Sequence, residues 1–214
     1  MIGLLGGSFD PVHFGHLRPA LEIQQYLGLD EVRLVPCHVP PHRPQPVASP
    51  QQRITMLNAA VANYPVFSVD SREFDREGPS YTLDTLKSFR KDMAGTTLCL
   101  LLGMDAFLGL TSWHRWHELT DYCHMIVMKR PGVQLPEQGE LADFIRLHRV
   151  MDAGKLRLQA AGLLLFHQVT QLDISATAIR KLLGSGGEAG FLLPERVLDI
   201  VRSEGVYAGG NTDE

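Results

Sequence analysis

Short apolar runs alternate with helix-length amphipathic segments over most of the chain. The strand-sized runs are Ile2–Leu5, Val32–Val35, Val66–Val69, Leu98–Leu102, His124–Met128 and Leu163–Phe166. The run Leu98–Leu102 is apolar at every position, as expected of a parallel strand that helices cover on both faces. Strands that alternate with helices in this way are typical of α/β proteins. The pattern therefore predicts a doubly wound, mostly parallel α/β sheet.

The segments with helical periodicity lie between these runs and after the last one. They are Phe14–Leu27, Ser49 to about Asn63, Ser80 or Thr82 to about Met93, the amphipathic Leu141–Met151, Ser175–Leu183 and Pro194–Ser203. Ser49 is placed to cap its helix, with Pro50 at the first helical position. The stretch Pro36–Pro50 holds six prolines, which exclude a helix or a central strand. We expect an ordered excursion or a mobile loop there.

Chain length sets the expected domain organisation. A chain of 214 residues can bury a sizeable core without disulfides or metals. We expect a single domain at residues 1–208, which includes C-terminal helices at 175–204, followed by a disordered tail at 209–214. No run of 18 apolar residues is available for a membrane span, and the first residues lack the positive charge of a signal peptide.

Charge and cysteine content exclude several classes of protein. A net charge of −4 disfavours a protein that grips a nucleic-acid backbone. The three cysteines are widely spaced and contain no C-x-x-C pair, which excludes a disulfide scaffold and a zinc ribbon. We therefore expect a reduced, cytoplasmic protein whose partners are small molecules, and neither nucleic acid nor a membrane.

The segment between the first strand and the first helix carries the strongest chemical signal. Gly6 and Gly7 allow a sharp turn at the end of the strand, where α/β proteins bind ligands. His13 and His16 lie on one side of the helix start, and Gly15 between them leaves room for a phosphate. A helix N-terminus attracts anions through its free N–H groups and its dipole. Either histidine alone fits an ordinary surface position, but the whole constellation predicts a phosphate site.

A second segment with similar chemistry lies at residues 173–180. Ser175 is a suitable N-cap, and Thr177 and Arg180 follow within the next turn. Hydroxyl groups, free amides and a guanidinium converge in such an arrangement, and arginine binds phosphate oxygens through a bidentate fork. Alone, the segment fits an ordinary capped helix. Together with the first segment, it predicts a site for a di- or triphosphate.

The first segment ends in His13-Phe14-Gly15-His16 and closely resembles the H-x-G-H signature of a nucleotidyltransferase superfamily. The resemblance implies a Rossmann-like nucleotidyltransferase fold in which ATP or CTP lies over the first strand and both histidines contact its phosphates. The second segment is similar to the superfamily's second phosphate-binding signature, commonly I-S-S-T-x-x-R. Ala176 departs from that signature at its second serine, so we expect no phosphate contact from this position.

Further elements narrow the resemblance. In chain order they are Pro40–Arg43, Gly78–Thr82, Gly103–Asp105, Trp113–Trp116 and Arg130–Gly132. With both signatures, this ordered set resembles the bacterial nicotinate-nucleotide adenylyltransferases over nearly the whole chain. The resemblance implies transfer of an adenylyl group from ATP to nicotinate mononucleotide, with release of pyrophosphate, on the route to NAD.

The resemblance also implies the residues that bind and react. For catalysis they are His13, His16 and Arg180. For ATP and its phosphates they are Gly6, Gly7, Ser8, Phe9, Gly15, Arg43, Gly103, Asp105, Ser175, Thr177 and Arg180. For nicotinate mononucleotide they are Ser8, Tyr81, Thr82, Trp113, His114 and Arg130, with Trp113 as the stacking surface for the pyridine ring.

Several positions keep two interpretations. Trp116 fits a core position as well as a binding position. Asp105 either caps the next helix or contacts a ribose or a metal-bound water, and its place at the end of a strand favours the second role. Arg43 and Arg130 are either ligand contacts or solvated charges. Three further residues are expected to be structural: Cys99, His124 and His148.

The implied reaction needs no general base, because the attacking 5′-phosphate is already anionic at neutral pH. The protein would align the substrates and neutralise charge on the transferring and leaving groups. Mg²⁺ would be held mainly by ATP phosphates and water, with no direct protein ligands, since few carboxylates occupy the motifs. Two alternatives stay open. One is an adenylyltransferase for another acceptor, nicotinamide mononucleotide or phosphopantetheine; the other is a non-catalytic nucleotide sensor on the same fold.

Overall fold

The computed structural model describes residues 1–41, 44–129 and 132–209. Within these residues the strands are β1 (Ile2–Gly7), β2 (Glu31–Pro36), β3 (Phe67–Val69), β4 (Leu98–Gly103), β5 (His124–Lys129), β6 (Arg149–Val150) and β7 (Leu164–Gln168). The α-helices are α1 (Phe14–Leu27), α2 (Pro50–Val61), α3 (Thr82–Asp92), α4 (Met104–Leu108), α5 (Leu119–Tyr122), α6 (Glu140–His148), α7 (Ala176–Gly184) and α8 (Glu195–Ser203). Three short 3₁₀ turns are η1 (Leu110–Ser112), η2 (Trp116–Glu118) and η3 (Ala153–Arg157).

The strands form one sheet in the order β3-β2-β1-β4-β5-β7-β6, and all neighbouring pairs are parallel. The chain therefore winds outward from β1 in one direction and then returns to build the other half from β4. This topology confirms the predicted doubly wound sheet. Residues that follow β1 and β4 meet at one edge of the sheet, at the point where the strand order reverses. Ligands of open α/β sheets bind in the crevice at this point.

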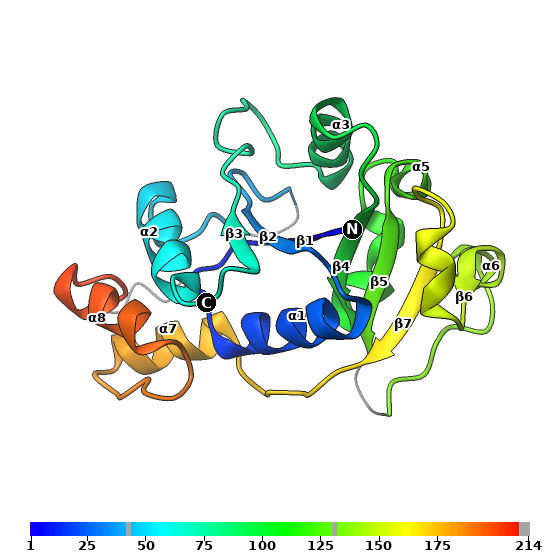
Figure 1. The fold of residues 1–214 in the computed structure, drawn as a ribbon. Coiled ribbons are helices and arrows are strands. Elements are labelled where there is room, and N and C mark those ends of the chain that lie inside the picture. The colour runs from blue at the N-terminus through cyan, green and yellow to red at the C-terminus, as the bar shows by residue number, and fades with distance from the viewer. Residues whose placement is uncertain (42–43, 130–131, 210–214) are drawn as a thin grey trace.

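Helices cover both faces of the sheet, as Figure 1 shows for α1 on one side and α3 on the other. The strand β4 is apolar because its alternate residues pack into cores on opposite faces of the sheet. Cys99 and Leu101 belong to the core that packs under α1, α2, α7 and α8, whereas Leu100 and Leu102 belong to the core under α3, α4, α5 and α6. The first of these cores includes both Leu5 and Tyr207, so that the two ends of the chain share one apolar interior.

The helix starts follow their local sequences. Ser49 Oγ accepts a hydrogen bond from the Gln52 amide, and the Gln52 side chain accepts one from the Ser49 amide, with Pro50 as the first helical residue. Ser175 Oγ accepts from the Ala178 amide at 3.2 Å at the start of α7. Both predicted caps are therefore confirmed. Each cap satisfies a backbone donor that the helix itself cannot pair.

Some elements differ from the sequence pattern. The amphipathic segment Leu141–Met151 is divided, because α6 ends at His148 and Arg149–Val150 join β7 at the edge of the sheet. A strand of two residues has no periodicity of its own. The short helices between residues 104 and 122 were not expected either, because helices of four or five residues depend on tertiary packing.

Two sequence expectations concern membrane insertion and the chain end. No helix in the described part of the chain is long and apolar enough to cross a membrane. Of the tail at 209–214, only Gly209 falls within the described residues, so the expectation of disorder for the rest lies outside them.

Candidate functional site

The two histidines of the first segment lie together at the start of α1. His13 is the N-cap residue and is only 4% exposed. Its ring stacks on that of His16, with centroids 3.8 Å apart, and the Phe9 ring meets His16 edge-on at 5.1 Å. The backbone of Phe9 adopts a positive φ of 49°, which turns the chain sharply after β1. A short turn therefore delivers both imidazoles to one point.

Burial decides the protonation of His13. It lowers the pKa of this imidazole from 6.5 to about 4, so the ring is neutral at pH 7. Its Nδ1 atom is buried and has no hydrogen-bond partner among the residues that the structure describes. A buried polar atom of this kind is stabilised when a ligand supplies the missing hydrogen bond.

Gly15 allows the second segment to approach the first. A Cβ atom at this position would lie 2.9 Å from the His13 ring and 3.0 Å from the Ile174 carbonyl oxygen. Both distances are shorter than ordinary contacts, so any side chain would force the two segments apart. The glycine is therefore required by the close approach of residue 174 to the histidines, in addition to any room it leaves for a phosphate.

Arg180 connects the two segments directly. Its Nη1 donates a hydrogen bond to the Asp10 carbonyl at 2.7 Å and lies 3.6 Å from Asp10 Oδ2. Its Nη2 donates to Thr177 Oγ1 at 3.3 Å. The guanidinium of α7 is thus held against the turn that carries the histidines, although 170 positions separate Arg180 from Asp10 in the sequence. The structure brings the predicted phosphate residues of both segments into one cluster.

Arg53, in α2, supports the same turn through hydrogen bonds to its backbone. The sequence analysis did not identify this residue. Its side chain is 1% exposed, and Nη1 donates to the Ser8 carbonyl at 2.9 Å and the Cys37 carbonyl at 2.7 Å. Its guanidinium carbon lies 5.0 Å from the centre of the Phe74 ring. In the described part of the chain it forms no ion pair. An arginine among the apolar positions of α2 is the sequence signal that could have drawn attention to it.

The thiol of Cys37, at the end of β2, lies beside this turn. Its Sγ is 3.6 Å from Ser8 Oγ, and burial raises the pKa of the thiol above its usual value. Burial also raises the pKa of Cys99 to about 12. Because the thiolate is the nucleophilic form, burial makes both thiols weaker nucleophiles at neutral pH. The structural interpretation of Cys99 is consistent with its full burial in the core.

Two of the residues predicted for the pyridine nucleotide, Tyr81 and His114, are in contact. The rings of Tyr81 and His114 stack with centroids 4.3 Å apart, and Thr82 is the first residue of α3. Trp113 is partly buried against the core under α3, whereas Trp116 is 5% exposed and belongs to that core. The Trp116 ring also stacks on the ring of the exposed His117. The core interpretation of Trp116 is therefore the correct one.

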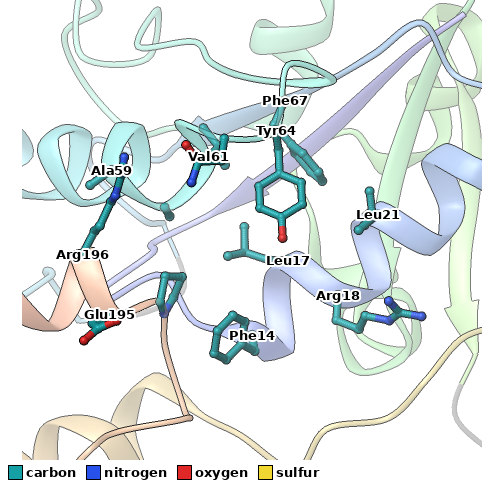
Figure 2. Close-up of a pocket in the computed structure, with 13 residues that line it drawn as sticks. Phe14, Leu17, Arg18, Leu21, Ala59, Val61, Tyr64, Phe67, Glu195 and Arg196 are labelled. Carbon is teal, nitrogen blue, oxygen red and sulfur yellow. The ribbon is translucent and has the colours of Figure 1, made fainter.

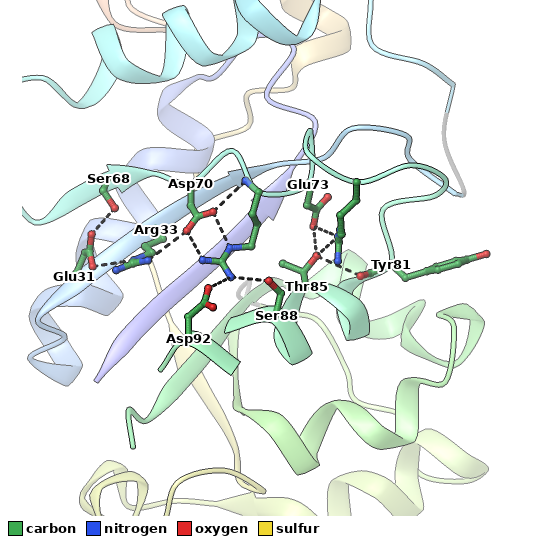
Figure 3. Close-up of polar contacts among 11 residues, drawn as sticks. Glu31, Arg33, Ser68, Asp70, Glu73, Tyr81, Thr85, Ser88 and Asp92 are labelled. Atoms are coloured by element: carbon green, nitrogen blue, oxygen red, sulfur yellow. Dashed lines mark hydrogen bonds and ion pairs between the residues drawn. The ribbon is translucent and has the colours of Figure 1, made fainter. Parts of the chain in front are cut away.

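Arginine-centred polar networks hold α3 in place (Figure 3). The Arg72 guanidinium bonds Asp70 on both oxygens, Ser88 Oγ at 3.0 Å and Asp92 at 3.1 Å. It also lies 3.5 Å from the centre of the Phe89 ring. These contacts link the segment after β3 to the C-terminal half of α3.

A second network lies nearer the helix start. Arg76 Nη2 donates to Thr85 Oγ1 at 2.6 Å, and that hydroxyl donates to Glu73 Oε1 at 2.5 Å. Thr85 belongs to the first turn that follows Tyr81, whose carbonyl accepts the Thr85 amide. The network therefore fixes the end of α3 that presents Tyr81 and Thr82.

The remaining predicted positions lie at the sheet edge or outside the described residues. Gly103 ends β4, and Asp105 lies in the first turn of α4, where a carboxylate interacts favourably with the helix dipole. Arg43 and Arg130 lie outside the described residues. Among the residues that are described, no group of three or more His, Cys, Asp or Glu side chains could hold a metal ion.

A separate cavity of about 460 Å³ lies between α1, α2 and the start of α8 (Figure 2). Phe14, Leu17 and Tyr64 line it, and none of its lining residues belongs to the predicted binding sets. Phe14 comes between the two histidines in sequence, but its side chain faces this other hollow.

Sequence comparisons identify relatives over nearly the full chain. The family model described as "Cytidylyltransferase-like" matches residues 4–182. A protein of Methylococcus capsulatus named "probable nicotinate-nucleotide adenylyltransferase" is 47% identical over 209 residues, covering 97% of this chain and 100% of that protein. A protein of Halorhodospira halophila with the same name is 48% identical over 208 residues, covering 96% of this chain and 94% of that protein.

Solved structures share the fold. The chain matches Plasmodium falciparum nicotinic acid mononucleotide adenylyltransferase complexed with NaAD with a TM-score of 0.70, covering 96% of each chain. The sequence identity in this comparison is 17%. The fold is therefore shared although most side chains differ.

Proposed function

The chain belongs to the nicotinate-nucleotide adenylyltransferases of the cytidylyltransferase-like family, and we propose that their reaction takes place at the carboxyl edge of β1 and β4. The reaction transfers the adenylyl group of ATP to nicotinate mononucleotide, and it yields nicotinate adenine dinucleotide and pyrophosphate in NAD biosynthesis. The 5′-phosphate of the mononucleotide attacks the α-phosphorus of ATP in line with the departing pyrophosphate. Because this phosphate is already anionic, the protein needs to supply alignment and positive charge instead of a base.

We assign the ATP phosphates to the cluster formed by His13, Gly15, His16 and Arg180, with Ser175 and Thr177 at the start of α7. The observation that carries this assignment is the hydrogen bond from Arg180 to the Asp10 carbonyl, which joins the two segments that we predict to bind phosphate. A neutral imidazole donates a hydrogen bond to a phosphate without giving up its proton. Together with the guanidinium, such donors stabilise the charge that develops on the transferring and leaving groups.

The adenosine part of ATP is assigned to the backbone at the ends of β1 and β4. The contributing residues are Gly6, Gly7, Ser8, Phe9, Gly103 and Asp105. The reversal of strand order between β1 and β4 supports this assignment, because nucleotides of doubly wound sheets lie over that crevice. Arg43, which follows the second strand, is our candidate for closing over the phosphates.

We assign nicotinate mononucleotide to Ser8, Tyr81, Thr82, Trp113 and His114. The pyridine ring would stack on Trp113, and its carboxylate would accept hydrogen bonds from backbone N–H groups near Thr82 and at His114, because the Trp113 N–H already donates to the Leu110 carbonyl. The support is the stacking of Tyr81 on His114, which brings α3 and the tryptophan segment together. Arg130 would add attraction for the carboxylate.

Mg²⁺ would enter with ATP. The cleft offers imidazoles and a guanidinium, and the buried Asp10 carboxylate already accepts three hydrogen bonds, so the donor set fits a metal held by phosphate oxygens and water. Asp105, in the first turn of α4, would be the candidate to accept a hydrogen bond from a metal-bound water. When bound, the metal would neutralise charge on the ATP phosphates.

Pyrophosphate release from ATP tests this proposal when it is measured with a panel of acceptors. We expect turnover with nicotinate mononucleotide and little with nicotinamide mononucleotide or phosphopantetheine. The amide would place an NH₂ group against N–H donors, and a mismatch of this kind can reject a substrate by roughly 10⁴-fold. Comparable kcat/KM values for acid and amide would contradict the assigned pocket. Absence of pyrophosphate with every acceptor would instead support a nucleotide sensor.

We also propose that residues 1–208 form one nucleotidyltransferase domain in a cytoplasmic protein. The shared core of Leu5 and Tyr207 supports the single domain. The three cysteines, none of which is paired with another, agree with a reducing compartment.

A further inference from the structure

Tyr207 lies near the end of the chain, and its hydroxyl reaches the first segment. It donates a hydrogen bond to Asp10 Oδ1 at 2.7 Å, across 197 positions of sequence. Tyr207 is 9% exposed and Asp10 is 3% exposed. Burial and the neighbouring Asp10 carboxylate raise the pKa of the Tyr207 hydroxyl, so it keeps its proton and is the donor in this pair.

The Asp10 carboxylate accepts two more hydrogen bonds. Its Oδ2 accepts the Val47 amide at 2.8 Å, and its Oδ1 accepts the Ala48 amide at 2.9 Å. These amides belong to the end of the proline-rich excursion, just before α2. A single buried carboxylate therefore joins the first segment, the excursion and the C-terminal end of the chain.

The contact between Arg180 and this carboxylate is long for an ion pair. The distance from Nη1 to Asp10 Oδ2 is 3.6 Å, whereas the same nitrogen donates to the Asp10 carbonyl at 2.7 Å. A carboxylate and a guanidinium without other partners form a close bidentate pair. Here three closer donors already occupy the carboxylate, which leaves the guanidinium available to an anionic ligand.

We propose that Tyr207 is a positioning residue for adenylyl transfer, which acts by keeping Asp10 from drawing Arg180 away from the ATP phosphates. Removal of the hydroxyl leaves Oδ1 with one donor fewer. The carboxylate then pairs more closely with Arg180, and the guanidinium is withdrawn from ATP. This inference rests on the proposed role of Arg180 in binding the ATP phosphates.

Tyr207→Phe tests the proposal because it removes one oxygen atom and keeps the ring. We expect the KM for ATP to rise about 3- to 10-fold, as the loss of one hydrogen bond would give, while the KM for nicotinate mononucleotide stays unchanged. The same shift should appear in the dissociation constant of ATP measured by calorimetry without acceptor. Tyr64→Phe, at a ring that is 50% exposed beside the separate cavity, is the matched control and should behave as wild type.

A double-mutant cycle separates this role from a merely structural one. In the Arg180→Ala background, Tyr207→Phe should have no further effect on ATP binding, because its effect passes through the guanidinium. All variants are compared at a temperature at which circular dichroism shows them folded. Unchanged ATP binding in Tyr207→Phe, an equal rise of both KM values, or an effect that persists in the Arg180→Ala background would each overturn the proposal. If Arg180→Ala itself leaves ATP binding unchanged, the assigned phosphate site fails first.

Discussion

The imidazole rings of His13 and His16 lie face to face with an angle of 28° between their planes. Two protonated rings at this separation would repel each other strongly, because little water screens them. Burial alone lowers the pKa of His13 to about 4, which keeps that ring neutral at physiological pH. The pair is therefore suited to receive the negative charge of a phosphate without two cations having to be buried together beforehand.

This arrangement predicts how stability depends on pH. The pKa of His13 in the folded protein, about 4, is below the value of 6.5 in the unfolded chain, so the unfolded chain takes up a proton first as the pH falls. The contribution of His13 to the free energy of unfolding is present in full above pH 6.5. It is lost as the pH falls towards 4, by up to roughly 3 kcal/mol. In His13→Gln, the free energy of unfolding from urea titrations should therefore fall less steeply between these pH values. His117→Gln, at an exposed imidazole, is the control; equal slopes in wild type and His13→Gln would contradict the prediction.

His16→Ala should lower kcat and leave substrate KM values nearly unchanged. Preorganised donors to a developing charge contribute about 10²- to 10³-fold to turnover, because they bind the transition state better than the ground state. Steady-state pyrophosphate release measures this effect, with His117→Ala as the comparison. A folded His16→Ala enzyme with wild-type kcat would show that the ring only packs against Phe9 and His13.

Gly15→Ala should disrupt the cluster. The added methyl group would lie 2.9 Å from the His13 ring and 3.0 Å from the Ile174 carbonyl, so α1 and the segment before α7 must separate. We expect a loss of about 1–3 kcal/mol in the free energy of unfolding, as for other overpacked sites, and at least a tenfold drop in kcat/KM. Gly95→Ala is the matched control, since no atom lies within 4 Å of a Cβ there. Similar behaviour of the two variants would argue against the close approach.

Arg180→Lys should weaken the use of ATP, and Arg180→Ala should weaken it further. The two terminal nitrogens of the guanidinium bond different partners, the Asp10 carbonyl and the Thr177 hydroxyl, and a single ammonium cannot span them while binding phosphate. Lys181→Ala removes a positive charge from the exposed side of the same helix and should leave the KM for ATP near the wild-type value. If Lys181→Ala and Arg180→Ala had equal effects, the contribution of Arg180 would be general electrostatic attraction only.

Arg53→Met should destabilise the fold by about 2–4 kcal/mol, because it removes the donor to the partly buried carbonyls of Ser8 and Cys37. Arg53→Lys should cost less, since the ammonium still reaches one of them. Urea denaturation measures both. Arg146→Met breaks an exposed ion pair with Asp143 and should cost less than about 1 kcal/mol. Wild-type stability of Arg53→Met would show that the two carbonyls find other donors.

The sequence by itself is sufficient for features that depend on neighbouring residues. The alternation of strands and helices, the caps at Ser49 and Ser175, and the residue patterns that predict phosphate binding in both segments are all local. Each follows from residues within one or two turns of each other, whose relative positions the backbone geometry dictates. These features are sufficient to predict the doubly wound sheet and the general place of the site.

Only the tertiary structure decided which distant residues meet. Asp10 contacts Arg180 across 170 positions and Tyr207 across 197, and no local pattern encodes either contact. The interior position of Trp116 and the edge strand β6 depend likewise on partners elsewhere in the chain. Such contacts follow from the order of strands in the sheet and from the packing of α7 and the C-terminal segment against the turn after β1. Because one buried carboxylate can satisfy donors from any part of the chain, its partners are determined by that packing and not by spacing in the sequence.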